Sequence, residues 1–294
     1  MPDLTQYVDE AVLSRLIETA RLEDLGPDGI DATSACFIDE AATSKADFVN
    51  REPGTIAGLS VLKTVCKVYG GRVTYSLHHS DGDTAQAGEK LATMTGPIRD
   101  LLAIERTALN IMTHLSGIAT LTAKYVAKCV GTKAKVYDTR KTLPGLRGLQ
   151  KYAVTCGGGG THRMGLYDAV LIKDNHLAGT PLDQLASKLT ESANHARKTV
   201  KNLKFVMVEV DTLDQLSQVL KAPIDIALLD NMPLSTLTQA VAMRNQHAPT
   251  IQLEASGGVN LNTVGNIAQT GVDRISVGAL THSAPSLDIG LDIG

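Results

Sequence analysis

The sequence of 294 residues contains no tryptophan and only three phenylalanines, and aromatic residues make up just 3% of it. Its core must therefore be aliphatic, a composition that suits buried parallel strands and the helices that cover them. Hydrophobic residues reach 43% and charged residues 20%, which is ordinary globular usage. The length exceeds what one core usually serves, so we expect two domains or one large α/β barrel with an appendage.

Other absences exclude classes of function. The net charge is only −3, which argues against binding of nucleic acid or a membrane surface through bulk charge. No C-x-x-C pair occurs, so we expect neither a zinc site nor a disulfide framework but buried, reduced thiols at Cys36, Cys66, Cys129 and Cys156. No apolar run approaches a membrane span, and the acidic first ten residues do not fit a signal peptide. These features predict a cytoplasmic protein.

The pattern of apolar residues changes near residue 131. Before it, helical spacing over 10–25 and 98–130 flanks a region of short stretches separated by Gly and Pro turns, which predicts a small antiparallel sheet. After it, compact β-rich stretches alternate with helical patterns, as in parallel sheets with right-handed crossovers. The strands are predicted at 134–137, 169–172, 205–210, 226–229, 251–253 and 274–277, and the helices at 146–156, 182–196, 213–220, 234–243 and 261–269. Six units are fewer than the eight of a complete barrel, so the sequence does not decide whether the sheet closes into a barrel.

Polar or glycine-rich residues lie at the end of each predicted parallel strand. In α/β barrels, catalytic groups project from the carboxyl ends of the strands, so we expect one crowded polar mouth. Its segments are 138–141, 173–176, 209–211, 230–231, 254–258 and 276–278.

Cations are concentrated in the first part of this mouth. Residues 135–176 contain seven Lys or Arg and three Asp, a local charge of +4 in a chain of −3. A cleft lined by one sign of charge focuses its field on a ligand of the opposite sign. We therefore expect a polyanion near Arg140, Lys141, Arg163 and Lys173, whereas Arg147 and Lys151 are expected on the solvated face of a helix.

The last two strand ends carry Ser256-Gly257-Gly258 and Ser276-Val277-Gly278. Small residues let backbone N–H groups approach a phosphate, and barrel phosphate sites commonly form at the final two strands. Glu209 and Asp230 are either ion-pair partners of the cations or ligands of Mg²⁺ and sugar hydroxyls, and we favour the second interpretation.

The glycine run 157–160 precedes Thr161-His162-Arg163 and is not a P-loop, because no Gly-Lys-Ser/Thr follows. It forms either a mobile loop that delivers His162 and Arg163 to an anion or a flexible connector.

Long segments of the chain resemble the quinolinate phosphoribosyltransferase family. They are 138–147, 151–154, the glycine run with His162-Arg163, and 170–176, with shorter matches at 23–26, 105–110, 115–120, 208–211, 228–231, 254–258 and 277–281. The resemblance implies an incomplete α/β barrel of six to seven strands over 116–280 and an N-terminal α+β open-sandwich domain over 1–115, on which 281–294 packs. It also implies phosphoribosyl transfer from phosphoribosyl pyrophosphate to quinolinate with decarboxylation, giving nicotinate mononucleotide, pyrophosphate and CO₂ in NAD biosynthesis, with Mg²⁺.

The resemblance assigns roles to individual residues. Arg140, Lys141, His162 and Lys173 would be catalytic, and together with Arg106, Thr139 and Arg163 they would surround the quinolinate carboxylates and the pyrophosphate. Glu209 and Asp230 would hold the ribose hydroxyls and Mg²⁺, while Ser256, Gly257, Gly258 and Gly278 would hold the 5′-phosphate. The family works as a homodimer with Arg106 donated across the interface, and a higher oligomer is compatible with this. No nucleic-acid or membrane partner is implied.

There are three rival interpretations, of which the second lies within the same fold and the third belongs to a different class of function. Lys173 at a strand end could form a Schiff base in an aldolase-like lyase, which borohydride trapping would reveal, but its Arg and His neighbours favour ion pairing. A molybdenum-transport-associated family is related, but the intact run 170–176 favours the quinolinate enzyme. A protein that binds both metabolites without turnover is the third.

Overall fold

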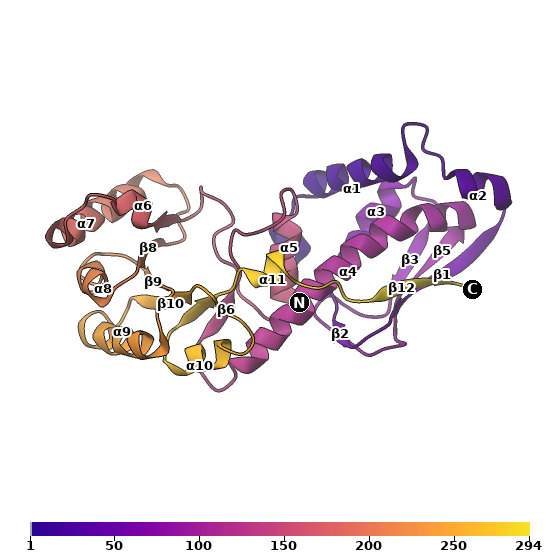
Figure 1. The fold of residues 1–294 in the computed structure, drawn as a ribbon. Helices are drawn as coiled ribbons and strands as arrows, with labels where there is room; N and C mark the ends of the chain where they lie inside the picture. The colour runs from indigo at the N-terminus through magenta and orange to yellow at the C-terminus, as the bar shows by residue number, and fades with distance from the viewer. Residues whose placement is uncertain (1) are drawn as a thin grey trace. The chain divides into compact units, whose positions relative to one another are not determined.

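A computed structural model describes residues 2–294 (Figure 1). Contacts within the chain divide it into two compact units: the first comprises residues up to 123, 142–158 and 283–294, and the second comprises 124–141 and 159–282. The predicted domain boundaries, 1–115 and 116–280, stay a prediction.

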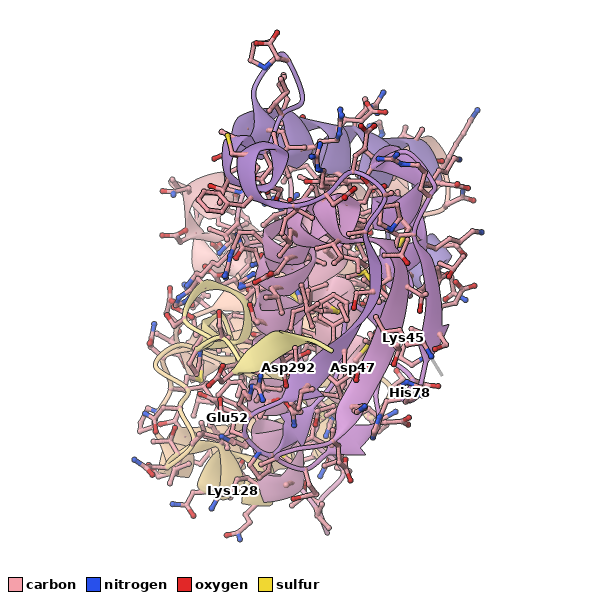
Figure 2. All side chains as sticks on the ribbon, turned by 90° about the vertical axis from the view of Figure 1, so that its right-hand side faces the viewer. Lys45, Asp47, Glu52, His78, Lys128 and Asp292 are labelled. Carbon is pink, nitrogen blue, oxygen red and sulfur yellow. The ribbon has the colours of Figure 1, made fainter. Side chains whose placement is uncertain are left out.

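The first unit contains an antiparallel sheet in the order β12-β1-β5-β3, as the turn-rich region predicted. The last strand, β12 (Ile289–Ile293), pairs with β1 (Thr43–Asn50), and Asp47 lies opposite Asp292 in this register (Figure 2). The other strands are β2 (Gly54–Thr55), β3 (Thr74–Leu77), β4 (Thr84–Ala85) and β5 (Lys90–Pro97). The helices are η1 (Leu4–Gln6), α1 (Glu10–Leu25), α2 (Ala32–Phe37), η2 (Leu59–Val61), α3 (Leu62–Val68), α4 (Ile98–Lys128, up to 123 in this unit) and α5 (Arg147–Cys156). The sequence predicted neither α2 nor α3.

Helix α5 belongs to the first unit, and this overturns the expectation that Lys151 is solvated. The helix approaches the N-terminal segment so closely that a Cβ on Gly148 would lie 2.5 Å from the Tyr7 carbonyl oxygen. Tyr152 donates a hydrogen bond of 2.6 Å to Asp81, and Lys151 is 0% exposed. A helix covered on several sides has no solvated face at this position.

The second unit contains a six-stranded parallel sheet in the order β6-β11-β10-β9-β8-β7. Its strands are β6 (Lys135–Tyr137), β7 (Val170–Ile172), β8 (Val206–Val210), β9 (Ile226–Asp230), β10 (Gln252–Ser256) and β11 (Arg274–Ser276). Its helices are α6 (Asp174–Leu177), α7 (Leu182–Thr199), α8 (Leu213–Val219), α9 (Leu234–His247), α10 (Val264–Gln269) and α11 (Ala279–His282). Within residues 2–294 the outermost strands, β6 and β7, do not pair with each other, so the predicted incomplete barrel is confirmed.

The core of this sheet is aliphatic, as the composition predicted. Met207, Ile226 and Leu228 form a buried cluster, against which Leu171 and Phe205 pack. Parallel strands buried on both faces read as continuous apolar runs, which is why these strands could be recognised. Three of the cysteines are buried, but Cys36 is exposed, contrary to expectation. None of the helices in the described part of the chain has the length and apolar character that crossing a membrane requires.

Candidate active site

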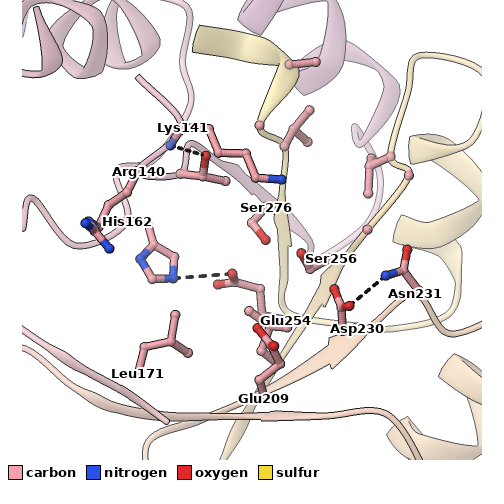
Figure 3. Close-up of a pocket in the computed structure, with 18 of the residues that line it drawn as sticks. Arg140, Lys141, His162, Leu171, Glu209, Asp230, Asn231, Glu254, Ser256 and Ser276 are labelled. Atoms are coloured by element: carbon pink, nitrogen blue, oxygen red, sulfur yellow. Dashed lines mark hydrogen bonds and ion pairs between the residues drawn. The ribbon is translucent and has the colours of Figure 1, made fainter. Parts of the chain in front are cut away.

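A cavity of about 800 Å³ lies at the carboxyl ends of the parallel strands (Figure 3). All the predicted site residues except Arg106 line it, and the structure thus brings them together from separate strand ends. They are Thr139, Arg140, Lys141, His162, Arg163, Lys173, Glu209, Asp230, Ser256, Gly257, Gly258 and Gly278. Arg106 lies on α4 in the first unit, 3.9 Å from the Glu105 carboxylate and with 62% of its side chain exposed.

The cations of the cavity face one another as well as acids. Lys173 Nζ donates a hydrogen bond of 2.6 Å to Glu209 Oε2. Burial lowers the pKa of Arg163, and the positive charge of Arg140 lowers it further, while Asp168 opposes this shift. An anion that binds between the two guanidinium groups would relieve their repulsion.

His162 is held in place by the strand that precedes it. Gly160 forms a parallel bridge to Tyr137 at the end of β6, and a Cβ at Gly160 would lie 2.6 Å from the Tyr137 ring, so a larger residue there would have to displace the ring. The backbone N–H of His162 then donates to Asp138 Oδ1 at 2.8 Å. His162 is 6% exposed and Arg163 is 7% exposed, so the glycine run places both side chains in fixed, largely buried positions.

The loop after β10 has the close backbone approach expected of an anion cradle. Gly257 has a φ of +89°, and a Cβ there would lie 2.1 Å from Asn231 Oδ1. Any larger residue would be strained and would collide with Asn231. The loop therefore keeps its backbone bare beside Ser256, at the edge of the cavity.

Glu254 and His282 also line the cavity, although no role was predicted for either residue from the sequence. Glu254 lies inside β10, is 0% exposed, and accepts a hydrogen bond of 2.6 Å from Arg274 Nε. Complete burial raises the pKa of the Glu254 carboxyl, and the charge of Arg274 and hydrogen bonds from Arg274 and Ser276 oppose this rise. A glutamate flanked by Leu253 and Ala255 was the signal that could have identified it.

The acids suit a metal that is shared with substrate. Within residues 2–294, no three His, Cys, Asp or Glu side chains form a metal-binding group. Glu209 and Asp230 nevertheless both line the cavity, and Mg²⁺ is commonly bound by one or two carboxylates plus substrate phosphates. The two residues therefore fit a Mg²⁺ ion that arrives with a phosphorylated ligand.

Comparison with known families covers nearly the whole chain. Residues 31–116 match the quinolinate phosphoribosyl transferase N-terminal domain, and residues 118–292 match its C-terminal domain. The chain belongs to the quinolinate phosphoribosyltransferase family. The resemblance noted in the sequence is thus confirmed.

Similar proteins are found among both curated sequences and solved structures. The chain is 46% identical over 269 residues to a carboxylating nicotinate-nucleotide pyrophosphorylase of Mycobacterium leprae, covering 90% of this chain and 92% of that one. It is also similar to the structure of the nicotinate-nucleotide pyrophosphorylase of Francisella tularensis, with a TM-score of 0.89, 35% identity and all of both chains covered. A structure of the Ehrlichia chaffeensis enzyme gives a TM-score of 0.85 at 39% identity, covering 96% of this chain and 98% of that one.

Proposed function

We propose that this chain transfers the phosphoribosyl group of phosphoribosyl pyrophosphate to quinolinate with loss of CO₂. The products are nicotinate mononucleotide and pyrophosphate, and the reaction belongs to NAD biosynthesis. The observation that carries the proposal is the arrangement of charge in one cavity. Arg140 and His162 lie on one side, Asp230 and Ser256 lie on the other, and Glu209 and Glu254 lie between them (Figure 3).

Each part of this cavity suits one part of the substrates. The planar guanidinium groups of Arg140 and Arg163 match carboxylates, which they can bind with two parallel hydrogen bonds. Leu171 and Leu228 also line the cavity and offer an apolar surface to a pyridine ring. The bare backbone at Gly257 suits a phosphate, and Glu209 and Asp230 suit the ribose hydroxyls.

The chemistry then follows from the charges. The pyridine nitrogen attacks C1 of the ribose as the bond from C1 to pyrophosphate breaks, through an oxocarbenium-like transition state. Lys141 and Lys173 stabilise the charge that develops on the pyrophosphate oxygens, because they are already positioned in a cavity. Mg²⁺, held by Glu209 and Asp230 together with substrate oxygens, would neutralise further phosphate charge when bound. The quaternised ring then accepts the electron pair of the carbon–carbon bond that breaks as CO₂ leaves, and the ring carbon takes up a proton.

One assay tests this function. Purified chain, quinolinate, phosphoribosyl pyrophosphate and Mg²⁺ are expected to release pyrophosphate and CO₂ in equal amounts. Nicotinate in place of quinolinate serves as the comparison and is expected to react poorly. Folded protein that turns over neither compound, or that is trapped covalently on Lys173 by borohydride with a carbonyl substrate, would overturn the proposal.

We also propose that the protein is a cytoplasmic homodimer in which Arg106 completes the site of the partner subunit. The Arg106 side chain is 62% exposed, and its contact with Glu105 on the same helix is long, at 3.9 Å, which supports this because the guanidinium group is accessible to a partner subunit. Mixing the inactive variants Arg106→Ala and Arg140→Ala should restore part of the activity, since hybrid dimers contain one intact site. Mixtures that stay inactive after subunit exchange would place both residues in the same subunit's site.

A further inference from the structure

The buried ion pair beneath the cavity contains an acceptor that its neighbours leave unsatisfied. Arg274 Nε binds Glu254 Oε2 at 2.6 Å, and its guanidinium group stacks 3.6 Å from the centre of the Tyr137 ring. The other carboxylate oxygen, Oε1, is buried and has no hydrogen-bond partner in the described residues. An unsatisfied buried acceptor is destabilising, so its retention at the wall of a cavity calls for an explanation.

The imidazole of His162 approaches this oxygen, and its Nε2 lies 3.6 Å from Glu254 Oε1 (Figure 3). The ring stands edge-on to Phe205, with centroids 5.3 Å apart and an interplanar angle of 89°. His162 Nδ1 accepts a hydrogen bond of 2.8 Å from the backbone N–H of Arg163. The two nitrogens therefore have different partners on opposite sides of the ring.

These contacts assign the position of the imidazole proton. A neutral imidazole has one donor nitrogen and one acceptor nitrogen. Since Nδ1 accepts the Arg163 N–H, the proton is on Nε2 and points toward Glu254. Glu254 Oε2 already accepts from Arg274, which leaves Oε1 as the acceptor that faces Nε2–H.

We propose that Glu254 is a positioning residue, which keeps His162 in the Nε2–H tautomer and fixes its ring at the wall of the quinolinate pocket. The arrangement follows the logic by which a buried carboxylate orients a histidine in catalytic triads. Arg274 anchors the carboxylate from behind and balances its charge, so that Glu254 does not repel a dianionic substrate. This inference rests on the proposed function for its kinetic consequence but not for the tautomer itself.

The decisive variant is Glu254→Gln. Its single amide oxygen is required by Arg274 Nε, so its NH₂ group would face His162 Nε2–H, placing donor against donor. In ¹⁵N NMR of the full chain, with the His162 signals identified by their loss in His162→Gln, wild type should show a protonated Nε2 and an unprotonated Nδ1. Glu254→Gln should convert part or all of His162 to the Nδ1–H form.

The matched control is Asp273→Asn, which removes another carboxylate charge from a pair with a buried arginine in the same unit. Asp273 Oδ2 accepts from Arg244 Nη1 at 2.6 Å and does not line the cavity. This control should leave the His162 signals unchanged. A general loosening of the unit would instead move them in both variants.

Kinetics provide the second readout. Glu254→Gln should raise the KM for quinolinate about tenfold or more and leave the KM for phosphoribosyl pyrophosphate within about twofold, a coupling in the range of contacting residues. In a His162→Ala background the same substitution should change the quinolinate KM by less than about twofold. Independent, multiplying effects of the two substitutions would overturn the proposal.

The spectrum keeps the two hypotheses separate. A wild-type His162 that carries its proton on Nδ1, or one whose tautomer is unchanged in Glu254→Gln, overturns the positioning role even if the enzyme turns over quinolinate. Absence of turnover alongside the expected spectra would instead reject the proposed function and leave the pairing of Glu254 with His162 intact. The tautomer of His162 in the wild-type spectrum can be measured without any variant. The proposal can therefore be tested even if Glu254→Gln does not fold.

Discussion

The two ends of the parallel sheet use the same kinds of charged residue for different purposes. At the amino ends, Asp168, Asp225 and Asp273 lie one or two residues before β7, β9 and β11. Each carboxylate accepts a backbone N–H of a neighbouring segment and pairs with a lysine or an arginine. These acids are therefore satisfied within the chain, and they join adjacent strands and helices.

At the carboxyl ends the acids are only partly satisfied. Glu209 pairs with Lys173 and Glu254 pairs with Arg274, but these carboxylates also face a cavity of about 800 Å³. A charge is therefore informative about function when the fold leaves some of its hydrogen-bonding capacity for a ligand. Removing an acid at the amino ends should cost stability, and removing a cation at the carboxyl ends should cost activity.

The largest effect is expected for the Glu254–Arg274 pair, which is buried within the sheet and also borders the cavity. Arg274→Met leaves Glu254 buried without its cation and should lower the free energy of unfolding by about 3–5 kcal/mol. The double variant Glu254→Leu/Arg274→Met removes both charges and should recover much of this loss. Urea unfolding monitored by circular dichroism measures both. A single variant as stable as wild type would show that the pair does not contribute to the core as described.

The next effect is confined to activity. Arg140→Ala should reduce kcat/KM by at least about a hundredfold, the scale for losing one preorganised electrostatic donor, with little change in unfolding. Lys135→Ala is the matched control, because Lys135 is an exposed cation at the start of β6, the strand that leads to Arg140. Equal losses of kcat/KM in the two variants would mean that a cation matters equally at either end of the sheet. That result would contradict the proposed difference between the two ends.

Much of this organisation was predictable from the sequence. The apolar runs of β8 and β9 and the polar residues that follow them identified the sheet and its functional edge, because parallel strands bury both faces. Arg163 and Lys173 were recognisable for the same reason, since they adjoin a glycine run and a strand end. The order of the segments along the chain was sufficient for this.

Long-range packing was not predictable. The burial of Lys151 depends on contacts of α5 with segments distant in sequence, including the close approach of Gly148 to Tyr7. Glu254 was assigned to a polar segment, but its role depends on Arg274 and His162, which lie on other elements. A sequence pattern indicates on which face of a helix or strand a residue lies, but it does not identify the residue's partner on another element.

A smaller effect tests the amino ends. Asp273→Asn weakens the pairs with Arg244 and Lys133, which lie 2.6 and 2.7 Å from the carboxylate. Because Arg244 is 3% exposed, the substitution should lower the free energy of unfolding by about 1–3 kcal/mol. Turnover of quinolinate should stay within about twofold of wild type at 25 °C, since a stability loss of this size leaves a typical domain folded. A large loss of activity in fully folded protein would contradict the division between the two ends.

The smallest effect is the pH dependence of the stability that Asp273 contributes. Burial acts to raise the pKa of Asp273, but hydrogen bonds and ion pairs with Lys133, Leu253 N–H and Arg244 outweigh it, so the pKa is lowered in the folded chain. A carboxyl whose folded-state pKa is lowered contributes its stability in full above the unfolded value of about 3.9 and loses it as the pH falls through the folded value. The difference in unfolding free energy between wild type and Asp273→Asn should therefore be constant near neutral pH and shrink below about pH 4. Urea unfolding of both proteins from pH 7 to pH 3 measures this difference, and a gap that stays constant to pH 3 would show that the ionised carboxylate is not what stabilises the amino end.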